Sequence, residues 1–122
     1  MNKYQHLFSP IKIGTVEVPN RIALLPMGVF SPRMMNNDGS YTKDGADYYI
    51  ERAKGGTGLI ITGLVPVPKG AGLPSIVNDV KSYTENMKYL ADGVHKYGSK
   101  VFVMLTAMSG RASIHATDPD RK

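Results

Sequence analysis

Three short apolar runs recur along the chain at the spacing of consecutive strand–helix units. They lie at residues 22–25, 58–62 and 101–105. Each run is apolar nearly throughout, which is typical of parallel strands that are buried on both faces. The segments between the runs carry apolar residues at helical spacing. The pattern therefore predicts an α/β fold with a parallel sheet.

Two helices are predicted between these strands. Thr42 is placed to cap the first, and the glycines at 55 and 56 end it. A capping box at residues 82–85 opens the second helix, with Thr84 as an alternative cap, and Gly98 ends it. The apolar faces consist of Ala46, Tyr49, Ile50 and Ala53 in the first helix and of Met87, Leu90, Ala91 and Val94 in the second.

The connections differ in length on the two sides of the sheet. The segments 27–40 and 63–78 after the first two strands are long, whereas the returns 55–57 and 98–100 are short. Prolines at 66, 68 and 74 predict that the segment 63–78 has no regular structure. In a (β/α)8 barrel the loops after the strands build the active site, and the opposite loops only close the structure. The lengths therefore favour a barrel.

A doubly wound nucleotide-binding sheet is the alternative architecture. Such a fold more often places a glycine-rich phosphate loop directly after its first strand. Here only Gly28 stands in that position. Residues 11–18 alternate apolar and polar around Gly14-Thr15, which predicts a hairpin that would plug the bottom of a barrel. Both features favour the TIM barrel.

The length of the chain limits how much of a barrel it can form. It has 122 residues, of which 42% are hydrophobic and 20% charged, a normal globular composition. A complete TIM barrel takes about 250 residues. We therefore expect residues 1–122 to form an N-terminal hairpin and the first three βα units of a barrel that is incomplete in this chain, with no internal domain boundary.

Charge and cysteine content exclude several classes of partner. The 15 Lys and Arg residues give a net charge of +5 but are scattered, which argues against nucleic-acid binding. The absence of cysteine excludes disulfides and cysteine-ligated clusters in this segment. The N-terminus lacks the apolar stretch of a signal peptide, and no run approaches the ~20 residues of a membrane span. We expect a cytoplasmic protein with no membrane partner.

Candidate catalytic motifs are few. The histidines at 6, 95 and 115 lack the spacing of metal ligands, and we expect His95 to face solvent. Tyr48 and Tyr49 are interpreted as core or rim residues of a helix. No Ser-His-Asp arrangement, phosphate loop or pair of catalytic carboxylates is apparent. The residues alone therefore assign no catalytic group.

Three ordered blocks carry a resemblance to a known family. Residues 7–27, 48–62 and 95–111 resemble successive parts of the old yellow enzyme family of FMN-dependent NADH:flavin oxidoreductases. The sequence Leu105-Thr106-Ala107 is similar to that of the family branch that contains enoate reductases and bile-acid-inducible reductases. The match is specific because the blocks are spread over nearly the whole chain.

The resemblance implies an FMN-dependent enzyme that reduces the activated C=C bond of a small enoate or enone with NAD(P)H. It implies a TIM barrel with FMN at the carboxyl ends of the strands. Two alternatives stay open: an amine- or NADH oxidase-type flavoenzyme on the same barrel, and an inactive truncated remnant without flavin. An iron–sulfur cluster and an FAD domain in a following C-terminal region, and a homo-oligomer, are also left open.

The resemblance also implies where the cofactor is held. The family's proton donor belongs to a strand beyond Lys122, so no catalytic residue is assigned and the chain alone is expected to be inactive. Arg111 is expected near the flavin or the substrate, although pairing with Asp118 or Asp120 is the alternative. The implied cofactor-binding positions are Pro26, Met27, Gly28, Gly63, Met104 and Arg111.

Position 104 departs from the family pattern. Gln is usual there, and its amide hydrogen-bonds the flavin ring. The thioether of Met104 cannot replace that donor and acceptor. Losing one such bond costs about 0.5–3 kcal/mol, which is expected to weaken FMN binding without abolishing it.

Overall fold

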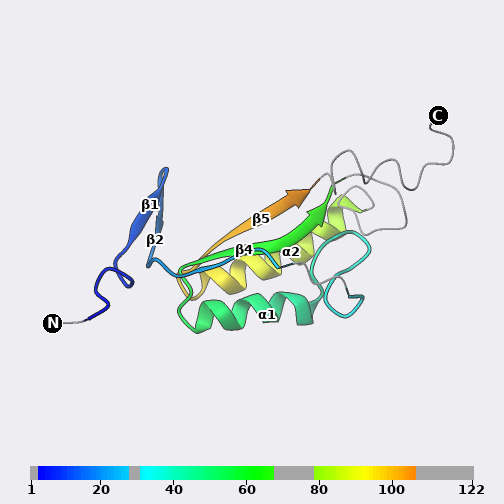
Figure 1. Cartoon of the computed structure of the whole chain (residues 1–122). Coiled ribbons are helices and arrows are strands. Elements are labelled where there is room, and N and C mark those ends of the chain that lie inside the picture. Colours follow the sequence, from blue (N-terminus) through cyan, green and yellow to red (C-terminus); the bar gives the residue numbers. More distant parts are fainter. Residues whose placement is uncertain (1–2, 28–30, 68–78, 107–122) are drawn as a thin grey trace, which may run out of the picture.

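The computed structural model describes residues 3–27, 31–67 and 79–106. Figure 1 shows a parallel sheet with two helices along one face and a separate hairpin at the end where the strands begin. The elements in chain order are β1 (Ile11–Ile13), β2 (Val16–Val18), β3 (Ala23–Leu24), α1 (Lys43–Lys54), β4 (Leu59–Pro66), α2 (Val80–His95) and β5 (Lys100–Thr106). The order of elements confirms the α/β prediction.

The hairpin forms as predicted. β1 and β2 pair antiparallel, with Ile11 opposite Val18. Gly14 in the turn has a φ of 58°, a conformation that residues with a side chain rarely adopt. Asn20 follows the hairpin, and its side-chain amide donates to the carbonyl of Gly56 at 2.8 Å. This bond ties the hairpin to the short return between α1 and β4, on the side opposite the long loops.

The sheet has the strand order β3-β4-β5, with both pairs parallel. β3 has only two residues, and Leu25 after it is 66% exposed. The prediction that residues 22–25 form a strand buried on both faces is therefore wrong. Within the described residues β3 pairs with β4 alone, and the helices cover only one face of the sheet.

β4 is longer than predicted. It continues through Gly63 to Pro66, so the prediction that residues 63–66 belong to an irregular loop is wrong. The amide of Val67 donates to the carbonyl of Thr106 on β5. Because successive residues of a strand point their main-chain groups to opposite sides, Pro66 faces the β3 side, where β3 has already ended. No ladder bond is lost there, and proline is tolerated.

The core lies between the sheet and the two helices. α1 begins after Thr42, whose hydroxyl accepts a hydrogen bond from the amide of Gly45 at 3.2 Å, as predicted. Neither helix in the described part of the chain is long and apolar enough to cross a membrane. The buried cluster consists of Met35, Tyr41, Ala46, Tyr49, Ala53, Ile60, Val65, Leu90 and Val94.

α2 begins earlier than predicted. Its cap is Asp79, whose carboxylate accepts from the amide of Ser82 at 3.0 Å. Thr84 lies inside the helix, where its hydroxyl donates to the carbonyl of Val80 at 2.8 Å. The capping box at 82–85 and the alternative cap at Thr84 are therefore both wrong, because Asp79 supplies an equally good acceptor one turn earlier.

The two candidate caps of α2 can be separated by mutation. Asp79→Ala is expected to lower the free energy of unfolding by about 1 kcal/mol, because one amide of the first turn loses its acceptor. Thr84→Ala is the matched control, and we expect a change within about 0.5 kcal/mol. Urea titrations of both variants measure the difference, and a larger loss for Thr84→Ala would contradict the observed helix start.

Candidate functional site

The predicted cofactor residues that the structure describes lie toward the carboxyl ends of the parallel strands. These ends point in one direction, away from the hairpin (Figure 1). Pro26 and Met27 follow β3, and Met104 lies near the end of β5. Met27 is 66% exposed and Pro26 is half-buried. Gly28 and Arg111 lie outside the described residues, as do Asp118 and Asp120, so their predicted roles are untested.

Gly63 lies inside β4 rather than in a loop after it, so its predicted place is wrong. Its amide donates to the hydroxyl of Tyr49 at 2.9 Å, and its carbonyl accepts from the hydroxyl of Tyr41 at 2.9 Å. The Tyr49 hydroxyl in turn donates to that of Tyr41 at 3.3 Å. The three residues form a closed ring of hydrogen bonds. The main-chain groups of Gly63 are thus already paired within the fold.

Met104 is joined to the same region through Thr62. The Met104 amide lies 3.4 Å from the Thr62 hydroxyl, which donates to the carbonyl of Gly63 at 3.0 Å. Val101 on the same strand packs against the core, so alternation turns the side chain of Met104 to the face away from the helices. Positions 63 and 104, both predicted to contact the cofactor, are therefore bridged by one side chain.

The residues at this edge fit the apolar part of a flavin. Leu24 packs against the core, so alternation puts the 66% exposed Leu25 on the opposite face. Phe102, 38% exposed, lies on that face together with Met104. A flat conjugated ring can pack on such side chains. The amides of Gly63 and Met104 are used inside the fold, so the described residues offer the ring contact surface more than hydrogen bonds.

Tyr41 remains a neutral phenol. Burial raises the pKa of its hydroxyl well above the usual value, and the hydrogen bond with Tyr49 raises it further. The rings of the two tyrosines pack edge to face with centroids 5.0 Å apart. Because Tyr41 keeps its proton across the physiological range, its donation to the Gly63 carbonyl is independent of pH.

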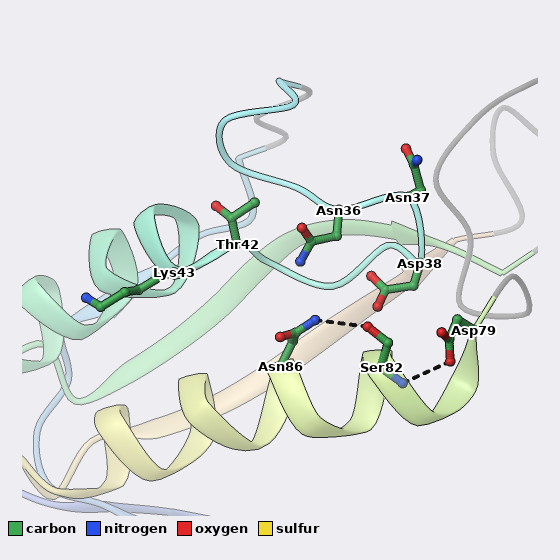
Figure 2. A pocket seen from close by; sticks show the side chains of 8 residues that line it. All are labelled: Asn36, Asn37, Asp38, Thr42, Lys43, Asp79, Ser82 and Asn86. Carbon is green, nitrogen blue, oxygen red and sulfur yellow. Dashed lines mark hydrogen bonds between the residues drawn. The ribbon is translucent and has the colours of Figure 1, made fainter.

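A separate polar pocket lies between the loop before α1 and the start of α2 (Figure 2). Its volume is about 530 Å³. It shares no residue with the predicted cofactor positions, and sequence reasoning missed it. The local signal for it in the sequence is Asn37-Asp38-Gly39, which is typical of a turn. The lining residues are Asn36, Asn37, Asp38, Thr42, Lys43, Asp79, Ser82 and Asn86.

Asp38 organises this pocket. One carboxylate oxygen accepts from the amide and the hydroxyl of Ser40 at 2.8 and 2.6 Å. The other oxygen is buried and has no hydrogen-bond partner among the described residues. The Asn86 amide reaches across from α2 to the Ser40 hydroxyl at 3.0 Å. The network thus fastens the loop before α1 to the first turns of α2.

Acid is expected to weaken this connection. Burial alone would raise the pKa of Asp38, but the hydrogen bonds from Ser40, together with the nearby polar side chains of Ser82 and Asn86, outweigh it and lower the pKa below its ordinary value of 3.8. A depressed pKa stabilises the fold above the unfolded-state value, and that stability is lost as the pH falls through the folded-state pKa. Asp38→Asn should remove this part of the acid dependence. Unfolding free energies between neutral pH and about pH 3 test it, and parallel curves would contradict it.

Histidines and acidic groups do not gather in the part of the chain that the structure describes. His6 and His95 are exposed on different segments, which confirms the prediction for His95. His115 lies outside the described residues. Among residues 3–27, 31–67 and 79–106, no group of three or more His, Cys, Asp or Glu residues is arranged to hold a metal ion.

Comparison with known proteins finds matches over nearly the whole chain. A model of the NADH:flavin oxidoreductase / NADH oxidase family matches residues 6–122. A cinnamate reductase of Clostridium sporogenes is 43% identical over 120 residues, which are 93% of this chain and 18% of that protein. An NADH oxidase of Thermoanaerobacter brockii is 37% identical over 108 residues, 86% of this chain and 16% of that protein.

A solved structure agrees with these relatives. The Old Yellow Enzyme from a Pichia species superposes with a TM-score of 0.67 and 31% identity, covering 82% of this chain and 26% of that one. The chain thus spans less than a third of the length of the relatives it matches. The likeness extends over most of the described elements.

Proposed function

The chain belongs to the NADH:flavin oxidoreductase / NADH oxidase family, and we propose that it forms part of the FMN-binding barrel of an ene-reductase. Its substrate would be a small enoate or enone, reduced at the C=C bond with NAD(P)H in the cytoplasm. The 43% identity to a cinnamate reductase across almost the whole chain is the observation that carries this proposal.

The architecture supports the proposal. In TIM barrels the active site lies at the carboxyl ends of the strands. Here β3, β4 and β5 would form one arc of the barrel wall, with α1 and α2 outside and the opposite face of the sheet inside. Leu25, Phe102 and Met104 would then line the interior. The hairpin would lie across the opposite end.

The chain's own residues would bind and orient the cofactor. A bound FMN supplies hydride transfer between the nicotinamide and an unsaturated substrate. Met27, exposed beyond β3, and Met104 on β5 would offer apolar contacts to the ring. Pro26 would fix the backbone that leads from β3 to these contacts. Gly28 and Arg111 complete the proposed binding positions.

A second candidate is an NADH oxidase-type flavoenzyme that passes electrons to oxygen. The 37% identity to an NADH oxidase favours it. The two candidates share the same fold and cofactor, so they differ only in the acceptor. The position of the described residues is compatible with either.

One experiment tests both candidates. The protein that carries this chain is purified, freed of unbound small molecules and examined for a flavin absorption spectrum. It is then supplied with NADH and cinnamate without oxygen, and separately with NADH and oxygen. Loss of the cinnamate double bond supports the ene-reductase, whereas NADH consumption only with oxygen supports the oxidase. A protein free of flavin that binds no added FMN would overturn both.

Restoring the family's amide at position 104 should strengthen FMN binding. Met104→Gln is expected to make the free energy of FMN binding more favourable by about 0.5–3 kcal/mol, because the amide can hydrogen-bond the ring. The FMN dissociation constant should fall accordingly. The matched control is Val103→Gln, which places the same amide on the opposite face of β5. Fluorescence titration of FMN measures both, and an equal gain in the two variants would contradict the proposed contact.

A further inference from the structure

The β4–β5 ladder is interrupted where the predicted cofactor positions lie. Ile61 pairs with Phe102 and Leu64 pairs with Met104, so two residues of β4 intervene where β5 has one. The intervening residues are Thr62 and Gly63. Such a bulge leaves main-chain groups without ladder partners. Because Thr62 and Gly63 are buried, those groups need other partners within the fold.

Three hydroxyl groups supply these partners. Tyr49 accepts from the Gly63 amide, Tyr41 donates to the Gly63 carbonyl, and Thr62 bridges that carbonyl to the Met104 amide. The two tyrosines are each only 3% exposed, and Thr62 is fully buried. The bulge is therefore held by specific buried side chains.

The tyrosines connect the bulge to two other parts of the fold. Tyr49 comes from the middle of α1, and its ring packs edge to face against Tyr41 and Tyr48. Tyr41 comes from the loop before α1 and forms a β-bridge with Met35. Both rings are fixed by packing, so their hydroxyls present a rigid template to the main chain of Gly63.

We propose that Tyr41 and Tyr49 are positioning residues that hold the β4 bulge in the one geometry that sets residues 63 and 104 at the flavin edge. The inference rests on the proposed function, since it assumes that FMN binds at the strand ends. Without the two hydroxyls the bulge would have alternative arrangements, and only a fraction of the molecules would present the binding geometry. Apparent affinity falls by that fraction.

Removing one hydroxyl tests the inference with little change in volume. In Tyr49→Phe the Gly63 amide loses its acceptor, and its hydrogen exchange is expected to accelerate at least about tenfold. The FMN dissociation constant is expected to rise about tenfold, and the flavin reduction potential to shift. Tyr41→Phe should act in the same direction. The matched control is Tyr48→Phe, which removes a hydroxyl from the neighbouring residue of α1 outside the ring of hydrogen bonds.

Position 62 provides a second test if a tyrosine variant fails to fold. Thr62→Ser keeps the bridging hydroxyl and should retain the FMN affinity and potential of the parent. Thr62→Val keeps the shape but removes the hydroxyl, and should weaken FMN binding like the tyrosine variants. A difference between the two variants at equal stability supports positioning.

The outcomes separate the inference from the proposed function. A parent protein that binds no added FMN contradicts the proposed function itself. In a second outcome, the parent binds FMN and the variants exchange the Gly63 amide faster, but the variants keep the FMN affinity and the flavin reduction potential of the parent. This outcome overturns the inference, because the hydroxyls would then have a purely structural role. Equal weakening by Tyr48→Phe overturns it as well. Weaker FMN binding confined to the variants at 41, 49 and 62 that lose a hydroxyl supports it.

Discussion

Replacing Gly45 by alanine is expected to destabilise the fold by about 2–4 kcal/mol, although alanine is the better helix former. A methyl group built on Gly45 would overlap the carbonyl oxygen of Met34 and lie 3.2 Å from the Tyr41 ring. The carbonyl cannot move freely, because it accepts the amide of Thr42 at 3.1 Å. The gain of about 1 kcal/mol in helix propensity is therefore outweighed.

Gly55→Ala is the matched control for this prediction. Gly55 caps the other end of α1 with an ordinary helical φ of −72°, and its nearest atom, the carbonyl oxygen of Arg52, would lie 3.4 Å from the new methyl group. We expect Gly55→Ala to change stability by no more than about 1 kcal/mol, in the stabilising direction. Urea titrations measure the free energy of unfolding of both variants and test this prediction. A neutral Gly45→Ala would mean that α1 does not approach the Met34 carbonyl so closely.

Local signals explain which elements could be predicted from the sequence. α1 has a good cap in Thr42, an apolar face at helical spacing and two glycines at its end. The hairpin has Gly14 in its turn, and the three strand centres are apolar. Each signal lies within a few residues of the feature that it predicts. The elements and their order were therefore readable without tertiary information.

The errors arose where a distant partner decides the structure. The extent of β4 depends on β5, which supplies bonds as far as Thr106, and Pro66 is harmless only because β3 ends early. The exposure of Leu25 depends on what covers the second face of the sheet. The start of α2 is a local error: the prediction weighed the capping box at 82–85 and Thr84, and overlooked Asp79, which has the same cap chemistry.

The sequence predicts where the candidate site lies but not which hydrogen bonds hold its residues. The alternation of strands and loops indicated the strand ends as the site. The hydrogen bonds to Gly63 come from Tyr49 and Tyr41, which are 14 and 22 positions away in the sequence. In the polar pocket, a hydrogen bond joins Ser40 to Asn86, 46 positions away. A glycine inside an apolar run does suggest a bulge. That signal at Gly63 could have extended the strand, but it could not identify the tyrosines.

Truncating Ile60 is expected to have the largest effect among single core substitutions on β4. Ile60 is fully buried between the sheet and the helices, in one cluster with Leu90 and Val94. Ile60→Ala should cost about 3–5 kcal/mol, because lost burial is compounded by a cavity that the packed helices cannot fill. A loss of this size is a large part of the 5–15 kcal/mol that stabilises a typical domain.

Ile61→Ala makes the same chemical change one residue further along the strand. Ile61 faces the side of the sheet away from the helices and is half-buried, so we expect a loss of about 1 kcal/mol. Urea unfolding of the two variants measures the ratio of these losses. Comparable losses would mean that both faces of β4 are packed equally in solution, as they would be if other parts of a barrel, or a second copy of the chain, covered the face that carries Phe102 and Met104. The pair of variants thus reports directly on whether the proposed interior of the barrel is closed.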